Sequence, residues 1–134
     1  MNVSEELIRS IVEKVISETA AASNKCGFQK QVDPSGIIGV KTSTVKLEPF
    51  EGRNDVKLKD VATLEEAPRM GCGIMELSDG ADFEWTLTYD EWDIVLEGRL
   101  EIKIDGRVVG GDAGDVIYIP KGSHIHFQTP DHTK

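Results

Sequence analysis

The stretch "YDEWDIVLEGRLEIKIDG", which runs from Tyr89 to Gly106, decides the fold class of this chain. Apolar residues recur at every second position on both sides of Glu97 and Gly98. A period of two is typical of β-strands, because successive side chains of a strand point to opposite faces of a sheet. The stretch therefore predicts two strands joined as a hairpin at Glu97-Gly98, with one apolar face and one mixed face that carries carboxylates.

The composition of the whole chain indicates one acidic, cytoplasmic domain. The chain has 134 residues, 39% of them hydrophobic, and a formal net charge of −9. This charge argues against nucleic acids and anionic membrane surfaces as partners, since both are bound through clustered Lys and Arg. No apolar run approaches the roughly 18 residues needed to span a bilayer. Cys26 and Cys72 lack the spacing of a zinc site or a disulfide framework, which favours a reducing compartment.

Residues 1–18 predict an amphipathic helix. β-Branched residues recur there at helical spacing and form a single apolar stripe, namely Ile8, Ile11, Val12, Val15 and Ile16. A helix of about 15 residues is marginal alone in water, so this stripe needs a partner. Residues 19–36 lack periodicity and are rich in small and turn-forming residues, which predicts a linker. Two interpretations follow: a docking segment ahead of the domain, or a helix packed against the flank of that domain.

Residues 37–134 carry a β pattern. Short, mostly alternating segments are separated by glycine or acidic turn residues and span residues 44–50, 73–78, 83–89, 92–97, 99–105 and 115–119. Several short strands at this spacing are typical of an all-β sandwich or barrel. We expect such a small barrel to pair as a homodimer, because pairing covers an exposed sheet face or edge.

Two segments of this region resemble the two sequence motifs of the cupin superfamily, whose members are jelly-roll barrels, also called double-stranded β-helices. Glu91 and Gly98, with six residues between them, match the end of the first motif. Gly114, Pro120 and Gly122 match the second motif, G-x-x-x-x-x-P-x-G. The resemblance implies a cupin-type barrel over about residues 40–134, preceded by the N-terminal helix.

Most metal ligands of the cupin motifs are replaced in this chain. The two histidines of the first motif would stand near Trp85 and Leu87, and the histidine of the second motif would stand at residue 125, which is Ile125. Of the usual ligands only Glu91 is left. Iron and manganese sites of this type need neutral imidazoles beside the carboxylate, so we expect no transition metal at the usual cupin position.

His124 and His126 flank the position of the missing histidine in the second motif. On a regular strand both side chains point to the face opposite that of residue 125. A one-residue bulge near Gly122 is the alternative, and it would turn His124 inward.

The stretches "DPSGIIGVKTSTVKLEPF", "YDEWDIVLEGRLEIKIDG" and "GDVIYIPKGS", with an F-x-W-x-L pattern before the second, resemble the EutQ family of ethanolamine-utilisation proteins. That family also lacks the metal histidines, works with bacterial microcompartments, and has an acetate kinase activity attributed to it. The resemblance implies a cytoplasmic, microcompartment-associated protein that interconverts acetate and ATP with acetyl phosphate and ADP, using Mg²⁺. It further implies that residues 1–18 bind shell or cargo proteins of the compartment.

Phosphoryl transfer of this kind requires Mg²⁺ held by carboxylates, together with donors for the phosphates. Glu91 and Asp93 share one face of a strand, and two crowded carboxylates raise one pKa or bind a cation. We therefore predict Glu91, Asp93 and Tyr89 as catalytic residues at the barrel mouth.

The substrate-binding candidates are aromatic and apolar residues expected at that mouth and cations suited to a phosphate: Trp85, Leu87, Tyr118, His124, His126 and Lys103. Val116 and Tyr118 are expected to face the carboxylates from a neighbouring strand. The sequence contains no GxxxxGK[ST] loop, so a nucleotide site rests on the resemblance alone.

Three functions from different classes fit these features. One is an acetate kinase, supported by the resemblance and the paired carboxylates. Another is a non-catalytic small-molecule-binding or assembly module of the microcompartment, favoured by the replaced metal ligands and the missing nucleotide motif. The third is a metal-dependent cupin enzyme, which the replaced histidines disfavour.

Overall fold

The computed structural model describes residues 5–11 and 27–134. Its contacts divide the chain into two compact units, Met1–Lys46 and Leu47–Lys134. The second unit therefore begins at Leu47 rather than at residue 37, where the β pattern of the sequence placed the start of the barrel. Within the described ranges, no helix is long and apolar enough to cross a bilayer.

The first unit begins with a helical segment. Residues 5–11 are helical, in agreement with the predicted N-terminal helix, and the side chains of Ile8 and Ile11 are exposed. The rest of the expected helix, residues 1–4 and 12–18, lies outside the described residues.

A small hairpin follows in the same unit, where the sequence predicted a linker. Strands β1 (Lys30–Val32) and β2 (Ile38–Val40) pair antiparallel, and the 3-10 helix η1 (Thr42–Thr44) follows them. The Asp33 carboxylate closes the turn by accepting the backbone N–H of Ser35 at 2.8 Å. The expectation of a linker is thus wrong for residues 30–36, because strands of three residues are too short to reveal an alternating pattern.

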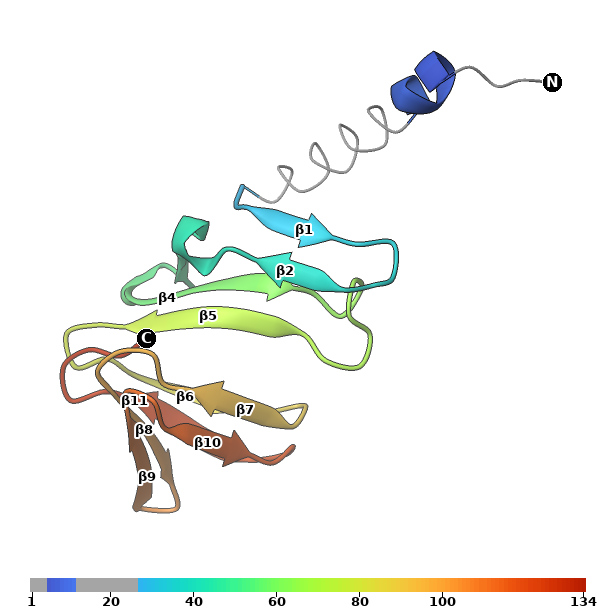
Figure 1. The fold of residues 1–134 in the computed structure, drawn as a ribbon. Helices are drawn as coiled ribbons and strands as arrows, with labels where there is room; N and C mark the ends of the chain where they lie inside the picture. The colour runs from blue at the N-terminus through green and yellow to red at the C-terminus, as the bar shows by residue number, and fades with distance from the viewer. Residues whose placement is uncertain (1–4, 12–26) are drawn as a thin grey trace. The chain divides into compact units, whose positions relative to one another are not determined.

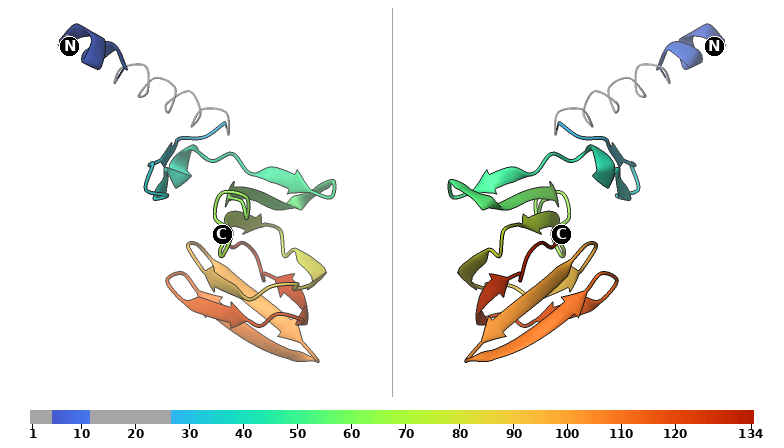
Figure 2. Two further views of the ribbon diagram at one scale, coloured as in Figure 1. Left: turned by 90° about the vertical axis from the view of Figure 1, so that its right-hand side faces the viewer. Right: turned by 90° about the vertical axis from the view of Figure 1, so that its left-hand side faces the viewer.

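The second unit is all-β, as predicted, and its strands form three antiparallel groups (Figures 1 and 2). The first group, in spatial order, is β3 (Glu48–Phe50), β4 (Arg53–Ala62) and β5 (Cys72–Leu77). The second is β6 (Asp82–Thr86), β11 (His124–Gln128), β8 (Arg99–Ile104) and β9 (Arg107–Asp112). The third is the pair β7 (Glu91–Ile94) and β10 (Val116–Ile119). Strands distant in sequence are thus neighbours, as a jelly roll requires.

The hairpin predicted at Glu97-Gly98 is wrong. β7 pairs with β10, whereas β8 pairs with β9 and β11, so the chain crosses between groups at this point. Gly98 has a φ of 69° and forms a β-bridge with Thr133. A side chain at Gly98 would collide with the carbonyl oxygen of His132, so only glycine permits this close approach. Two consecutive strands show a period of two whether a hairpin joins them within one sheet or the chain crosses from one sheet to another. The sequence pattern therefore did not distinguish these two connections.

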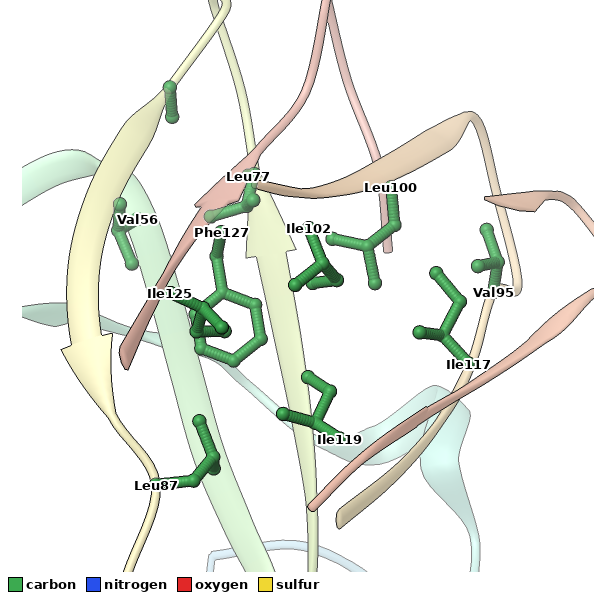
Figure 3. Close-up of a cluster of buried hydrophobic side chains, with 11 residues drawn as sticks. Val56, Leu77, Leu87, Val95, Leu100, Ile102, Ile117, Ile119, Ile125 and Phe127 are labelled. Atoms are coloured by element: carbon green, nitrogen blue, oxygen red, sulfur yellow. The ribbon is translucent and has the colours of Figure 1, made fainter. Parts of the chain in front are cut away.

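The core of the second unit fills the space between its strands (Figure 3). Its side chains are nearly inaccessible to solvent and come from both sheets and the β7–β10 pair: Val56, Leu77, Ala81, Leu87, Val95, Leu100, Ile102, Ile117, Ile119, Ile125 and Phe127. Each large aliphatic side chain buried in this way stabilises the fold by about 1.5–3 kcal/mol. This core packs against the inward-facing polar side chains of the barrel.

Within the second unit, β4, β9 and β11 are not among the segments expected from the sequence. In β4, Val56 and Leu58 alternate with Lys57 and Lys59, a period of two that is typical of a half-buried strand. β9 contains adjacent glycines, a residue type depleted in strands. In β9 the pairing with neighbours outweighs the local preference.

Candidate active site

Glu91 and Asp93 lie on the inward face of β7. Alternation along this strand leaves Trp92 and Ile94 with exposed fractions of 66% and 64%, while Glu91 and Asp93 are half-buried. Val95 continues the inward face into the core. The structure therefore brings both predicted carboxylates to the inside of the barrel, next to apolar side chains.

The two carboxyl groups form a coupled pair. Tyr89 and Asp93 each share a side-chain hydrogen bond with Glu91. One oxygen of Asp93, Oδ2, is buried and has no hydrogen-bond partner. A hydrogen bond between two carboxyl groups requires a proton on one of them, so this arrangement favours a shared proton over two ionised carboxylates.

Burial controls the ionisation of this pair. Desolvation, followed by the negative charge of Glu91 and the hydrogen bond to it, raises the pKa of Asp93 to about 8. Desolvation also raises the pKa of Glu91, although its hydrogen bonds with Asp93 and Tyr89 oppose that change. At neutral pH the pair therefore carries one negative charge fewer than two carboxylates in water would carry.

Tyr89 belongs to the same group of interacting side chains. Its pKa is raised first by partial burial and then by the charges of Glu91, Asp60 and Asp93. Asp60 comes from β4 and lines a surface hollow with Glu48, Leu58, Lys59 and Thr63. The sequence analysis did not select Asp60, because β4 was not recognised as a strand and no local pattern linked it to β7.

The positions of the replaced metal histidines are occupied by apolar side chains. Trp85 pairs across the ladder with the buried Ile125, which places it on the inner face of β6, and its ring meets Phe50 edge-on at 5.6 Å between centroids. Leu87 is 1% exposed and packs in the core. Trp85 thus lines the interior, while Leu87 supports the wall without offering accessible surface to a substrate.

Tyr118 lies on the opposite side of its strand from the position that the sequence analysis expected. In the ladder between β10 and β7, Tyr118 is opposite Trp92, with ring centroids 5.1 Å apart, and it is 47% exposed. Val116 is exposed on the same outer face. The prediction is wrong because Ile117 and Ile119 are the residues of β10 that enter the core.

His124, His126 and Lys103 lie on the outer face of the β6–β11–β8–β9 sheet. The register of β11 is regular, and Ile125 is the buried residue, as alternation predicted; the alternative bulge near Gly122 is absent from this ladder. Lys103 lies opposite His126 in the ladder with β8. These three substrate-binding candidates therefore face away from Glu91 and Asp93.

Each of the two histidines is held by a carboxylate of β6. The imidazole of His124 contacts Glu84 and lies 3.2 Å from the hydroxyl of Thr86. His126 Nδ1 is 2.7 Å from Asp82. Desolvation acts to raise the pKa of Asp82, but hydrogen bonds with His126 and Gln128 outweigh it and hold that pKa below its usual value.

A second polar cluster was not predicted from the sequence. Glu76, Glu97 and His132 converge from three separate segments, with one ligand atom of each within 4.8 Å of the others. No motif spacing connects these residues in the sequence. Only the pairing of Thr133 with Leu77 and Gly98 brings His132 to the two glutamates.

The chemistry of the Glu91–Asp93 pair suits a divalent cation. The orphaned, buried oxygen of Asp93 is an unsatisfied acceptor, and hard cations such as Mg²⁺ prefer carboxylate oxygens. A cation there would replace the proton that the pair otherwise shares, since two ionised carboxylates repel each other at this distance. The residues present are therefore of the kind that fits Mg²⁺, and Glu91 and Asp93 are the side chains that would hold it.

Curated relatives cover nearly all of this chain. A Clostridioides difficile protein named "Acetate kinase EutQ" is 44% identical over 99% of this chain and 86% of the relative. A Salmonella typhimurium protein of the same name is 37% identical over 94% of this chain, which spans 57% of the relative's length. An Escherichia coli protein of that name is matched over 58% of its length. This chain thus spans little more than half of the two enterobacterial relatives.

Solved structures give the same result for the fold. The structure of the Clostridium difficile EutQ protein superposes with a TM-score of 0.71 at 45% identity, covering 80% of this chain and 82% of that chain. The cupin domain of Schizosaccharomyces pombe Cnp3, 16% identical, covers 71% of this chain and 67% of its own with a TM-score of 0.58, which confirms the cupin-type barrel alone. The family model described as ethanolamine utilisation protein EutQ matches residues 3–134, and the chain therefore belongs to the EutQ family.

Proposed function

We propose that this protein is an acetate kinase of ethanolamine utilisation, which interconverts acetate and ATP with acetyl phosphate and ADP. The observation that carries the proposal is the half-buried Glu91–Asp93 pair with its unsatisfied oxygen. The curated names of the C. difficile and S. typhimurium relatives support the same activity. The description of the family, ethanolamine utilisation protein EutQ, supports a role for this reaction in ethanolamine utilisation.

In the proposed reaction, an oxygen of acetate attacks the γ-phosphorus of ATP, the bond to the bridging oxygen between the β- and γ-phosphates breaks, and ADP leaves. Acetate is already ionised at neutral pH, so its attack needs no general base. Mg²⁺, when bound, would supply positive charge to the phosphate oxygens. Glu91 and Asp93 would hold the ion in a half-buried site, where electrostatic interactions are stronger than in bulk water. Tyr89 orients Glu91 through its hydrogen bond.

The activity is tested with purified protein, MgCl₂, ATP and acetate, with hydroxylamine present to trap acetyl phosphate as acetohydroxamate. We expect hydroxamate to form only when protein, Mg²⁺ and ATP are all present. The reverse reaction, from acetyl phosphate and ADP, should yield ATP measured by luciferase. Failure of both directions would remove the kinase proposal.

A non-catalytic binding or assembly module is the second candidate, and one surface feature favours it. The outer face of the β7–β10 pair carries four large exposed side chains, Trp92, Ile94, Val116 and Tyr118. A contiguous apolar patch on a folded domain typically marks an interaction surface. Under this candidate, that face and the N-terminal helix join the protein to other copies or to compartment proteins.

We expect the outer face of the β7–β10 pair to form a homodimer, because a self-complementary patch on a two-fold axis covers itself. Trp92→Glu places a charge at the centre of this face and should give a monomer in sedimentation velocity, while the parent sediments as a dimer. Val108→Glu is the matched control, since Val108 is a similarly exposed apolar residue on β9. A monomeric parent, or a dimeric Trp92→Glu variant, would contradict this interface.

We also propose that residues 1–18 direct the protein to a bacterial microcompartment in the cytoplasm, where the segment binds shell or cargo proteins. Fused to a fluorescent reporter, the segment should bring that reporter into the compartments. Ile11→Glu with Val15→Glu charges the predicted apolar stripe and should abolish the localisation. Ser10→Glu with Lys14→Glu, at the same spacing on the polar side of the predicted helix, should leave it intact. Equal localisation of both double variants would refute an apolar docking stripe.

A further inference from the structure

We infer that Glu76, Glu97 and His132 form a binding site for a divalent transition metal, for which Zn²⁺ is the reference ion. His132 Nε2 lies 3.1 Å from Glu76 Oε2 and 4.0 Å from Glu97 Oε2. One imidazole nitrogen and two carboxylate oxygens are ligands that Zn²⁺ accepts, and three protein ligands leave a further position for water. Within residues 5–11 and 27–134, this is the group of three or more His, Cys, Asp or Glu residues whose ligand atoms converge closely enough to share one ion.

Main-chain hydrogen bonds hold the three ligands in place without an ion. The N–H groups of Leu77 and Thr133 each donate to the other residue's carbonyl oxygen at 2.9 Å, which fixes the chain beside Glu76 and His132. The N–H of Lys134 donates to the carbonyl oxygen of Glu97 at 3.0 Å, and the hydroxyl of Thr133 donates to the same oxygen at 3.0 Å. A preorganised set of ligands lowers the cost of ordering them on binding.

The charges of the cluster favour a cation. Two carboxylates, those of Glu76 and Glu97, lie 3.1 Å and 4.0 Å from the single imidazole of His132 and give the cluster negative charge. Lys57 lies opposite Glu76 in the ladder between β4 and β5 and offsets part of that charge. A divalent ion bound by the imidazole and the two carboxylates would balance the rest.

This site is separate from the proposed active site. Glu76 lies on the face of β5 opposite to that of the core residue Leu77, whereas Glu91 and Asp93 lie on the inward face of β7. An ion at His132 would tie residues 132–134 to β5 and to the crossover before Gly98. We therefore assign the metal a role in stability, and its presence does not depend on the kinase proposal.

The test uses the whole chain, stripped of metal by a chelator and titrated with ZnCl₂ by calorimetry in the presence of excess MgCl₂, which competes for the Glu91–Asp93 pair. We expect one saturable equivalent and a rise of the thermal unfolding temperature. His132→Gln and, independently, Glu97→Gln should each weaken Zn²⁺ binding by at least about tenfold and remove the rise in unfolding temperature. A cooperative thermal unfolding transition of each variant, measured without metal, shows that the variant is folded.

Two matched controls locate the ion. His124→Gln removes an imidazole from a surface carboxylate pair, and Glu91→Gln removes a ligand of the proposed active site; both should bind Zn²⁺ like the parent. Weaker binding in Glu91→Gln but not in His132→Gln would place the ion at the barrel interior and overturn the inference. No saturable binding by the parent would show that the cluster is an ion pair only, and would leave the kinase assay unaffected.

Discussion

Replacement of Glu91 by Gln is expected to lower the acetate kinase activity by about 10²-fold or more while the barrel stays folded. Glutamine keeps the size of the side chain, and its amide oxygen can still accept the hydrogen bond of Tyr89. It removes the negative charge that would balance a cation beside Asp93. Losing one electrostatic contact in a site sheltered from water costs roughly 3 kcal/mol of activation free energy, which corresponds to about 10² in rate.

The measurement is kcat with saturating Mg²⁺, ATP and acetate, together with the urea unfolding curve of the same protein. Glu101→Gln is the matched control, because Glu101 is a half-buried strand carboxylate that pairs with Arg99 on the outer side of β8. Its activity should equal that of the parent. Full activity in folded Glu91→Gln protein would place the chemistry elsewhere in the molecule.

Replacement of Asp93 by Asn is expected to make the free energy of unfolding less dependent on pH. In the parent, this free energy falls as the pH rises from about 4 to about 8. In the folded protein the pKa of Asp93 is raised to about 8 by burial and by Glu91, whereas an aspartate in an unfolded chain titrates near about 3.9. Between these values the folded state keeps a proton that the unfolded state has released. The free energy of unfolding therefore falls as the pH rises, and an asparagine at this position cannot contribute to that slope.

Urea unfolding at about pH 5 and about pH 8.5 measures this slope, and the Asn variant should gain on the order of 4 kcal/mol relative to the parent between them, at about 1.4 kcal/mol for each of roughly three pH units. Asp105→Asn is the control: Asp105 is an exposed turn residue with a positive φ of 48°, which asparagine tolerates. Its stability should follow that of the parent. Parallel pH profiles for the parent and Asp93→Asn would show that this carboxyl is ionised normally in the folded protein.

Local periodicity predicted several parts of the site. Alternation alone puts Glu91 and Asp93 on one face of a strand, and it puts His124 and His126 on the face opposite Ile125. Which face is the inner one followed from the match of Glu91 to a cupin motif. Hydrophobicity would have chosen the wrong face, because Trp92 and Ile94 are exposed while the carboxylates enter the barrel.

The features that sequence could not predict depend on pairing between distant segments. Tyr118 is on the outer face because Ile117 and Ile119 enter the core, and both faces of β10 are apolar enough for either orientation. Asp60 reaches the vicinity of Tyr89 only through the packing of β4. His132 joins Glu76 and Glu97 only after residue 133 has paired with two remote positions. No local pattern encodes such contacts.

The pairing of Thr133 with both Leu77 and Gly98 also sets an order of events during protein synthesis. On the ribosome, β5 and the crossover emerge well before residues 132–134, and until these residues appear the main-chain groups of Leu77 that they satisfy have no partner from that segment. Contacts between residues so far apart in sequence slow folding. A nascent chain therefore carries an open strand edge until residues 132–134 have emerged, and during that time it is open to association with other chains.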